Sequence, residues 1–539
     1  MVQGGRGQRS MSLALVIFVT ERILSSELSS DSMVYVEEPQ PMTASGQLRG
    51  LLRLRGLQLL ALAALLAFVG WRAMQMKFSV LDLDIWWHIK VGEWIVAHRG
   101  FPHVGILSRT AADRPWSAYS WGYELMLSRG YDWFGLVGVG MFGTLLTLTV
   151  AYAVYWMARR LSGNFWLACL LSTVSCSAFL FNLMPRPVFL SMTLYAVTLT
   201  VLLEAQRTGR VQLLYWLPLV FLLWANCHIQ FVYGIFTVGL FTGVHLLLQV
   251  AARWTMVGEW VGEWVRTSIL PARLLALIFA ACLLATCIGP YSYHLYFVVF
   301  AYASSTFPYT FIREFQALNF RAASHYVELV FAAIAFFTLG REKRIDLFKL
   351  GLMIVASVVA FRTMRDSWFL CIAAAACMAD TLGGKTLDRK CGENLFEKMG
   401  LAAALALLLI VFARNTDFNT QGLDDAMSSV FPVNAVNFLR RNPQPGPLYN
   451  TFDWGGFLTW YMPDQPVAID GRTDLYGDEI DTRFFKTQQG DASYVDDPYL
   501  NEARVLLLPK KVPLASVLLT DSRFSLIFQD RLAVIFVRH

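Results

Sequence analysis

Two carboxylates stand close together in residues 81–90, where Asp82 and Asp84 follow an apolar run and precede two tryptophans and His88. In an extended chain, side chains two positions apart face the same way, so this spacing predicts a surface with two carboxylates. One acid could take a proton from an acceptor hydroxyl while the other orients the acceptor or holds a divalent cation such as Mg²⁺ or Mn²⁺. Alternatively, both acids face water at the end of a membrane span, with Asp84 as the N-cap of the next helix.

Other residues of the same outer segment could contact substrate. His88 stands one helical turn after Asp84 and could orient that carboxylate or contact a phosphate, or it is a solvated ring. Trp121 and Glu124 belong to an aromatic cluster over residues 116–124. Such ring faces suit sugar rings, but they equally suit an aromatic belt at the membrane surface. Ile85, Trp86, Ile89 and Trp94 recur at helical spacing, which predicts a short helix lying in the interface with its aromatics at headgroup level.

Arginines recur at positions where a membrane protein normally has few of them. Arg186 lies between two prolines at the mouth of two apolar runs, and Arg362 and Arg365 lie in a later turn on the same side, with Glu314 in the loop before it. A cation there requires an anion. The phosphate of a lipid carrier would supply it, as would an acidic headgroup or a pairing between Asp and Arg.

Polar residues also interrupt two apolar runs at residues 224–230. Asn226 and His228 should lie at the outer face, either in a hydrated hairpin loop or in a broken helix that lines a cavity shared with Asp82.

The elements that must position these residues are membrane helices. The chain is 56% hydrophobic and 16% charged, with a mean hydropathy of +0.47, which is too apolar for an ordinary soluble globule. We therefore expect an α-helical polytopic membrane protein with about eleven spans. The apolar runs lie at approximately 57–74, 134–157, 164–183, 187–204, 212–225, 231–250, 274–289, 327–340, 345–361, 366–382 and 399–413.

Charge indicates the orientation of these runs. Alternate loops are rich in Lys and Arg, and the positive-inside rule makes them cytoplasmic. The N-terminus is then cytoplasmic, and the outer loop 75–132 and the C-terminal region are extracytoplasmic. The net charge of +6 is mostly this orientation signal, so nucleic acid is not an expected partner. The loops concerned contain Arg159 and Arg160; Arg207 and Arg210; Arg253, Arg266 and Arg273; Arg341, Lys343 and Arg344; Lys385, Arg389, Lys390 and Lys398.

Three regions follow from composition. Residues 1–50 are interpreted as a disordered cytoplasmic leader, residues 51–413 as the transmembrane body, and residues 414–539 as a soluble extracytoplasmic domain. Strand-like runs at 466–469, 504–508, 526–528 and 532–537, with a helix at 433–439, predict a small α/β domain in that last region. Two blocks rich in glycine and aromatics, 449–458 and 469–477, are typical of tight turns at strand ends, and Asp470, Arg472 and Asp474 there could bind substrate or pair with one another.

Together these features resemble the GT-C class of membrane glycosyltransferases, and the resemblance covers residues from about 57 to 539. The blocks that carry it are similar to those of a bacterial subgroup of GT-C-like proteins: Asp84-Ile-Trp-Trp-His-Ile with Gly92-Glu-Trp-Ile, Trp224-Ala-Asn-Cys-His, and Tyr449-Asn-Thr-Phe-Asp-Trp-Gly-Gly-Phe-Leu with Ile469-Asp-Gly-Arg-Thr-Asp-Leu-Tyr-Gly. The run Asn226-Cys-His228-Ile-Gln230 departs from the subgroup's Asn-x-His-Gly-Gly pattern, which puts in doubt any role there that needs a glycine-tight backbone.

The resemblance implies a glycosyltransferase of the bacterial inner membrane. It would move a sugar from a polyprenyl-phosphate-linked donor to a glycan, lipid or protein acceptor on the outer face, using an acid of the first outer loop. Asp84 is favoured over Asp82 because it directly precedes the Trp-Trp-His block. The alternative is a non-enzymatic subunit of a complex that assembles or exports envelope glycans or lipids, in which the C-terminal domain binds a partner.

Overall fold

The computed structural model describes residues 78–180, 184, 186–253, 262–266, 270–383 and 420–539, together with residues 58 and 406. All of these belong to one compact unit, Leu57–His539. The expected leader, and nearly all of the apolar runs at 57–74 and 399–413, lie outside the described residues.

The membrane body is helical. Among the described residues, four helices are long and apolar enough to cross a membrane: α5 (Trp121–Ser162), α7 (Val188–Thr208), α9 (Phe231–Ala251) and α14 (Ala323–Gly340). Shorter helices accompany them: α6 (Phe165–Leu180), η1 (Val211–Trp216), α8 (Leu217–Cys227), α11 (Ala272–Thr286), α12 (His294–Ser304), α15 (Leu347–Arg362) and α16 (Ser367–Leu382). The apolar runs expected between residues 134 and 382 each coincide with one of these helices, so a multi-pass helical protein is confirmed.

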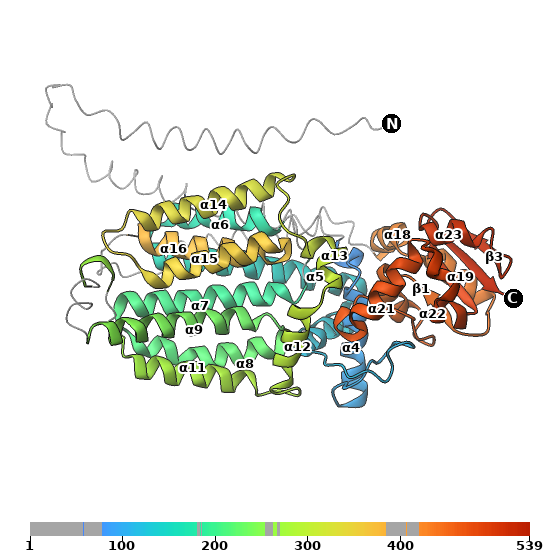
Figure 1. Ribbon diagram of the computed structural model, residues 1–539, viewed down its shortest axis with the longest axis horizontal. Helices are drawn as coiled ribbons and strands as arrows, with labels where there is room; N and C mark the ends of the chain where they lie inside the picture. Colours follow the sequence, from blue (N-terminus) through green and yellow to red (C-terminus); the bar gives the residue numbers. More distant parts are fainter. Residues whose placement is uncertain are drawn as a thin grey trace, which may run out of the picture. The chain divides into compact units, whose positions relative to one another are not determined.

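The helices pack as two groups. One contains α7, α8, α9 and α11, and the other contains α6, α14, α15 and α16 (Figure 1). Helix α5 packs against members of both groups, and α16 is the most enclosed helix, since every residue from 367 to 379 is buried. An apolar all-round sequence such as that of α16 is expected where a helix contacts protein on every side.

Helix α4 (Ile85–His98) begins where the spacing of apolar residues predicts, but its environment differs from the interfacial helix that we expect. Trp86 is fully buried and Trp87 is 6% exposed. The Trp86 ring packs against Phe431, Phe457 and Trp460 of the C-terminal region at centroid distances of 5.8, 5.6 and 4.4 Å. The prediction that these two tryptophans face lipid headgroups is therefore wrong, because protein from the far end of the chain covers Trp86.

The C-terminal region contains a four-stranded mixed sheet with helices around it, which confirms the combination of strands and helices expected there. The strands are β1 (Leu448–Asn450), β2 (Val505–Pro509), β3 (Phe524–Gln529) and β4 (Ala533–Arg538), in the order β1-β2-β4-β3. Only β1 and β2 are parallel, and Tyr449 pairs with Leu506 across them. The helical elements are α18 (Thr420–Val430), α19 (Val433–Arg441), α20 (Phe452–Tyr461), α21 (Thr473–Gln488), η4 (Ala492–Asp496), α22 (Pro498–Glu502) and α23 (Pro513–Leu518).

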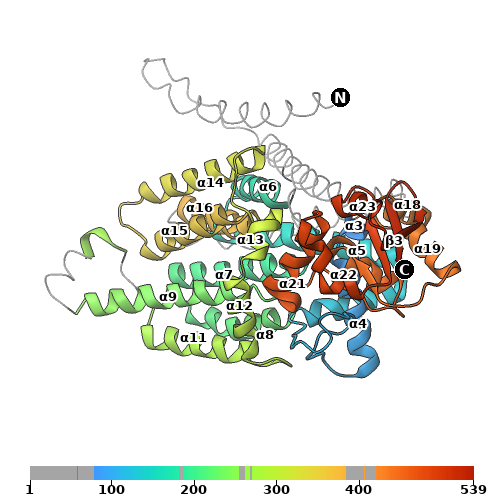
Figure 2. The same cartoon turned by 45° about the vertical axis from the view of Figure 1, so that its right-hand side comes forward.

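The strands expected at 504–508, 526–528 and 532–537 and the helix at 433–439 are present. The run 466–469 is not a strand of the sheet; it makes one parallel bridge, between Val467 and Ser108 of the first outer loop. The two glycine-rich blocks are also not simple turns, because they lead into α20 and α21. Both blocks face the first outer loop, and the C-terminal domain lies next to α4 in both views of the ribbon (Figures 1 and 2).

Candidate functional site

A tight turn places the two acids of the first outer loop. Helix α3 (Phe78–Leu81) ends immediately before Asp82, and Oδ1 of Asp82 accepts a hydrogen bond from the backbone N–H of Asp84 at 2.9 Å. Asp84 occupies the N-cap position of α4, but its side chain accepts no backbone N–H of that helix. Instead, Oδ1 of Asp84 accepts the indole N–H of Trp87 at 3.2 Å. The segment is thus a side-chain-closed turn rather than an extended strand.

Arg186 brings the two carboxylates together. Its Nε and one terminal nitrogen donate to Asp82 at 2.8 and 2.9 Å, and its other terminal nitrogen lies 2.9 Å from Oδ2 of Asp84. The Asp82 side chain is 1% exposed and that of Asp84 is 19% exposed. A bidentate Arg–carboxylate pair is among the strongest polar contacts, so Asp82 is fixed, while Asp84 keeps access to solvent or a ligand.

A second arginine extends this cluster. Glu314, in η2 (Arg313–Phe315), lies 3.5 Å from Arg186 and 3.6 Å from Arg365 of η3 (Met364–Asp366). Although burial acts to raise the pKa of Glu314, Arg186 and Arg365 hold it below its usual value. Three carboxylates against two guanidinium groups leave one excess negative charge when all are ionised.

Burial and this excess charge both act on Asp84. Burial, together with the charges of Asp82 and Glu314, raises the pKa of Asp84 to about 6, although Arg186 and the Trp87 hydrogen bond oppose the rise. A carboxylate of this pKa is ionised at neutral pH and is a stronger base than an ordinary aspartate. Asp84 is therefore suited to accept a proton.

His88 turns away from Asp84 and pairs with Glu124. Nδ1 of His88 lies 3.0 Å from Oε1 of Glu124, and both side chains are buried. Burial and the nearby positive charge of Arg186 lower the pKa of His88 well below its usual value, so the ring is neutral at pH 7. The His88 ring lies against that of Trp87 at a centroid distance of 3.6 Å, which supports the indole that bonds Asp84.

Three other candidates hold the helices together rather than joining the acids. The indole N–H of Trp121 donates to Oδ1 of Asn226 at 3.0 Å, and the Asn226 amide donates to two backbone carbonyls, those of Leu222 and Ile288, at 2.8 Å each. His228 is buried against the hydroxyl of Ser191 at 2.8 Å. These contacts link α5, α7, α8 and the segment after α11.

Arg362 is separate from the acid cluster. Its side chain is exposed, and its guanidinium lies 5.1 Å from the ring centroid of Tyr309. Among the residues that the structure describes, no carboxylate lies within ion-pair distance of it. Of the two arginines expected in this turn, only Arg365 reaches the site.

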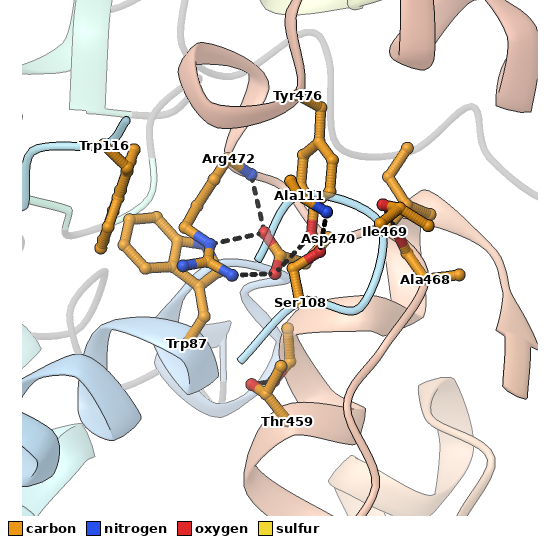
Figure 3. A network of polar contacts seen from close by, with 12 residues as sticks. Trp87, Ser108, Ala111, Trp116, Thr459, Ala468, Ile469, Asp470, Arg472 and Tyr476 are labelled. Atoms are coloured by element: carbon orange, nitrogen blue, oxygen red, sulfur yellow. Dashed lines mark hydrogen bonds and ion pairs between the residues drawn. The ribbon is translucent and has the colours of Figure 1, made fainter. Parts of the chain in front are cut away.

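The C-terminal domain completes the site from the other side. Asp470 and Arg472 are fully enclosed and form a bidentate pair at 2.9 and 2.6 Å (Figure 3). The Arg472 guanidinium lies 4.8 Å from the ring of Trp116 and 5.9 Å from that of Trp87, both of the first outer loop. Trp116 in turn donates to Asp474 at 2.9 Å. Of the two alternatives for these tail residues, pairing with one another holds for Asp470 and Arg472, whereas Asp474 bonds Trp116. Their contact with the Asp84 segment could not be predicted from spacing.

Two glycines allow this approach. A Cβ on Gly471 would lie 2.0 Å from Oδ1 of Asp84, and a Cβ on Gly456 would lie 2.4 Å from the carbonyl oxygen of Leu83. Contacts this short require glycine, because real Cβ atoms do not approach other atoms below about 3 Å. The glycines of the two tail blocks are the sequence feature that indicates a close backbone contact, but nothing in the sequence identifies the segment that they contact.

The acids as placed do not suit a divalent cation. Both oxygens of Asp82 are bonded to Arg186, and those of Asp84 are bonded to Trp87 and Arg186. Within the described part of the chain, no group of three or more His, Cys, Asp or Glu side chains has metal-binding geometry. Divalent cations need several oxygen ligands, so one could bind here only by displacing the guanidinium.

Comparison with known proteins gives structural matches. No protein-family model and no curated protein sequence matches the chain. Over most of the chain, the structure matches two GT-C glycosyltransferases. One is the Archaeoglobus fulgidus oligosaccharyltransferase in the apo form, with a TM-score of 0.46 and 11% identity over 84% of this chain and 69% of that one. The other is ArnT from Cupriavidus metallidurans bound to undecaprenyl phosphate, with a TM-score of 0.42 and 13% identity over 86% of this chain and 96% of that one.

Proposed function

We propose that the chain is a membrane glycosyltransferase that moves a sugar from a polyprenyl-phosphate-linked donor to an acceptor hydroxyl, with Asp84 as the general base. The observation that carries this proposal is the state of Asp84: a partly exposed carboxylate, paired with Arg186, whose pKa is raised to about 6. Perturbed acids of this kind cluster at catalytic sites. We place the site on the outer face of a bacterial inner membrane, as the distribution of Lys and Arg predicts.

The proposed transfer moves one proton to Asp84 and leaves one negative charge on the departing phosphate. The Asp84 carboxylate takes the proton of the acceptor hydroxyl, whose oxygen forms the new bond to the anomeric carbon of the donor sugar. The bond between that carbon and the phosphate oxygen breaks, and its electron pair stays on the phosphate. Arg365 is the better placed cation to stabilise this charge, because among the described residues only one carboxylate, that of Glu314 at 3.6 Å, lies within ion-pair distance of it, whereas Arg186 has three.

Arg186 has a different part in the same proposal. It already contacts Asp82, Asp84 and Glu314, so little of its charge is left for a phosphate. Its guanidinium keeps the pKa of Asp84 from rising further and fixes the direction of the carboxylate. We therefore infer that Arg186 and Asp82 are positioning residues, and that Arg365 is the phosphate ligand.

The test is transfer by the purified full-length protein in nanodiscs, supplied with a set of undecaprenyl-phosphate sugars and followed by mass spectrometry. Asp84→Asn should retain bound lipid and lose at least 100-fold in transfer rate, in the range seen when general bases are removed. Arg365→Ala should weaken lipid binding about tenfold or more, as expected for a lost charge-assisted contact. The matched control is Asp425→Asn, since Asp425 is an exposed acid of α18.

Two outcomes would contradict the proposal. Full transfer by Asp84→Asn would remove this acid from the mechanism. Absence of any transfer or lipid binding by the parent protein, with a partner protein retained only when residues 414–539 are present, would favour the assembly-subunit alternative.

A further inference from the structure

A cavity lies beside the acid cluster and contains none of its members. Its volume is about 780 Å³, within the range of small-molecule sites. It lies between the first outer loop, the segment that leads into α12, and the start of α21. The described side chains that line it include no Lys or Arg. The aromatic ones are Trp116, Tyr291, Tyr293, Phe297, Tyr302 and two histidines, His103 and His294.

The walls of the cavity offer flat apolar faces next to polar atoms. Tyr293 is 56% exposed, and no hydrogen-bond partner of its hydroxyl is found among the described residues. The hydroxyls of Ser117 and Ser292 on the same wall are likewise without a partner in the described part of the chain. Aromatic faces take the C–H surfaces of sugar rings, while free hydroxyls bond to the sugar's own hydroxyls.

Two carboxylates set the charge of the cavity. Asp478 accepts hydrogen bonds from Ser305 and from the N-terminal N–H groups of α13 (Phe307–Phe311) and the residue before it, which disperse its charge. Asp474 accepts the indole N–H of Trp116 through Oδ2 at 2.9 Å, and no other side chain among the described residues donates to it. Burial raises the pKa of Asp474 to about 6, which leaves it ionised at pH 7.5. A ligand with its own negative charge would meet repulsion here.

The cavity is connected to the acid cluster through two of its walls. Trp116 contacts Trp87 at a centroid distance of 6.4 Å, and Trp87 bonds Asp84. Tyr302 accepts a hydrogen bond from Thr473, in the tail segment whose Gly471 abuts Asp84. A molecule in the cavity is thus two side chains from the proposed base.

We propose that this cavity binds a non-reacting sugar ring of an extended acceptor, one that carries no anionic group, while another part of the acceptor reaches Asp84. The assignment as acceptor rests on the proposed glycosyl transfer; the binding of a neutral sugar does not. Tyr293 supplies the exposed stacking face, with Trp116 beside it in the wall, and Asp474 accepts hydrogen bonds from sugar hydroxyls. The absence of Lys and Arg from the described lining separates this ligand from the phosphate-bearing donor.

The experiment is saturation-transfer NMR on the full chain in lipid nanodiscs, which contain no sugar headgroup. The probes are glucose, galactose, mannose and N-acetylglucosamine, with glucuronate as the anionic counterpart of glucose. At least one neutral sugar should bind, and glucuronate should bind at least tenfold more weakly than glucose at pH 7.5. Asp474→Asn should weaken the neutral sugar about tenfold, as expected for loss of a charged hydrogen-bond acceptor, and should reduce the discrimination against glucuronate.

Tyr293→Ala tests the stacking face without disturbing the core. It should weaken the sugar about fivefold, whereas the control Tyr215→Ala should leave binding unchanged, because Tyr215 is 57% exposed on η1 and does not line the cavity. Binding that neither Asp474→Asn nor Tyr293→Ala alters, or the absence of binding by every neutral sugar, would overturn the inference.

The outcome also separates the two proposals. Asp84→Asn should bind the neutral sugar as the parent does while losing transfer. If transfer occurs but the cavity variants leave the KM for the acceptor unchanged, the cavity inference fails and the proposed function stands. If the sugar binds in the cavity but Asp84→Asn transfers normally, the reverse holds.

Discussion

The contact between Gly471 and Asp84 gives a prediction whose size follows from the structure. In Gly471→Ala the new Cβ would lie 2.0 Å from Oδ1 of Asp84 and 3.6 Å from Nε1 of Trp87. Gly471 does not lie in the left-handed region, so alanine can adopt its backbone conformation, and the effect is one of space alone. An ordinary contact needs about 3.4 Å, so the carboxylate or the tail loop must move by roughly 1.4 Å.

Either movement damages the proposed site. If Asp84 moves, it loses the 3.2 Å hydrogen bond from Trp87, which for a charged acceptor is worth about 1.5–3 kcal/mol. If the loop moves, it carries Arg472 away from Trp87 and Trp116, and overpacking of this kind costs about 1–3 kcal/mol. At about 1.4 kcal/mol per factor of ten, we expect the transfer rate to fall about 10- to 100-fold.

The assay is glycosyl transfer in nanodiscs together with the thermal unfolding midpoint. Gly243→Ala is the control, because Gly243 lies inside α9 and a Cβ there meets no atom within 4 Å. The double variant Gly471→Ala/Asp84→Asn should be no slower than Asp84→Asn alone, since both changes act on the same carboxylate. Transfer by Gly471→Ala at the parent rate would refute the reasoning, because it would mean that the tail does not hold Asp84 in the reacting protein.

Three further predictions concern charge. Arg186→Ala should lower the free energy of unfolding by about 3–5 kcal/mol, because it leaves the buried carboxylate of Asp82 unpaired. Arg362 is exposed, so Arg362→Ala should change the free energy of unfolding by less than about 1 kcal/mol. Thermal and denaturant unfolding of both variants measures the difference. Burial and neighbouring aspartates raise the pKa of Asp481 to about 9, so folding takes up a proton between about pH 4 and 9, and the free energy of unfolding declines across that window as pH rises. Asp481→Asn should remove this decline. The difference between the thermal unfolding midpoints of Asp481→Asn and the parent should therefore shift in favour of the variant from pH 5 to pH 8.5. The transfer rate should fall as pH decreases through about 6, where Asp84 takes up its proton. Trp87→Phe should move the midpoint of this fall to a higher pH, because the indole hydrogen bond lowers the pKa of Asp84. A pH–rate profile that shows no fall in rate on the acidic side would contradict the assignment of Asp84 as the base.

The sequence predicts single elements well and their mutual contacts poorly. The apolar runs give the helices, and the spacing of Ile85, Trp86 and Ile89 gives α4. That same spacing cannot say whether lipid or protein covers the apolar face, since both accept tryptophan. Trp86 is covered by Phe431 and Phe457, more than 300 residues away in the chain, and no local signal encodes so distant a partner.

The residues of the candidate site could likewise be predicted one by one, but the contacts between them could not. Asp84, Arg186, Glu314 and Arg365 each stand out as a charge at a membrane surface, but spacing does not reveal that they form one cluster. Asn226 stands out for the same reason and instead ties helices together. A polar residue at a helix end needs a hydrogen-bond partner, and the sequence looks the same whether that partner is a substrate or a backbone carbonyl.

The clearest case is the pair of aspartates. Asp82 and Asp84 are the same residue type two positions apart, and their environments give them different tasks. Asp82 takes two donors of Arg186 and the Asp84 backbone N–H, and with a 1% exposed side chain it has no room for a ligand. Asp84 takes one donor from Arg186 and one from Trp87, and burial without full pairing raises its pKa to about 6. The less satisfied carboxylate is the one that can still gain by accepting a proton, so incomplete pairing is what suits Asp84 for the proposed role of general base.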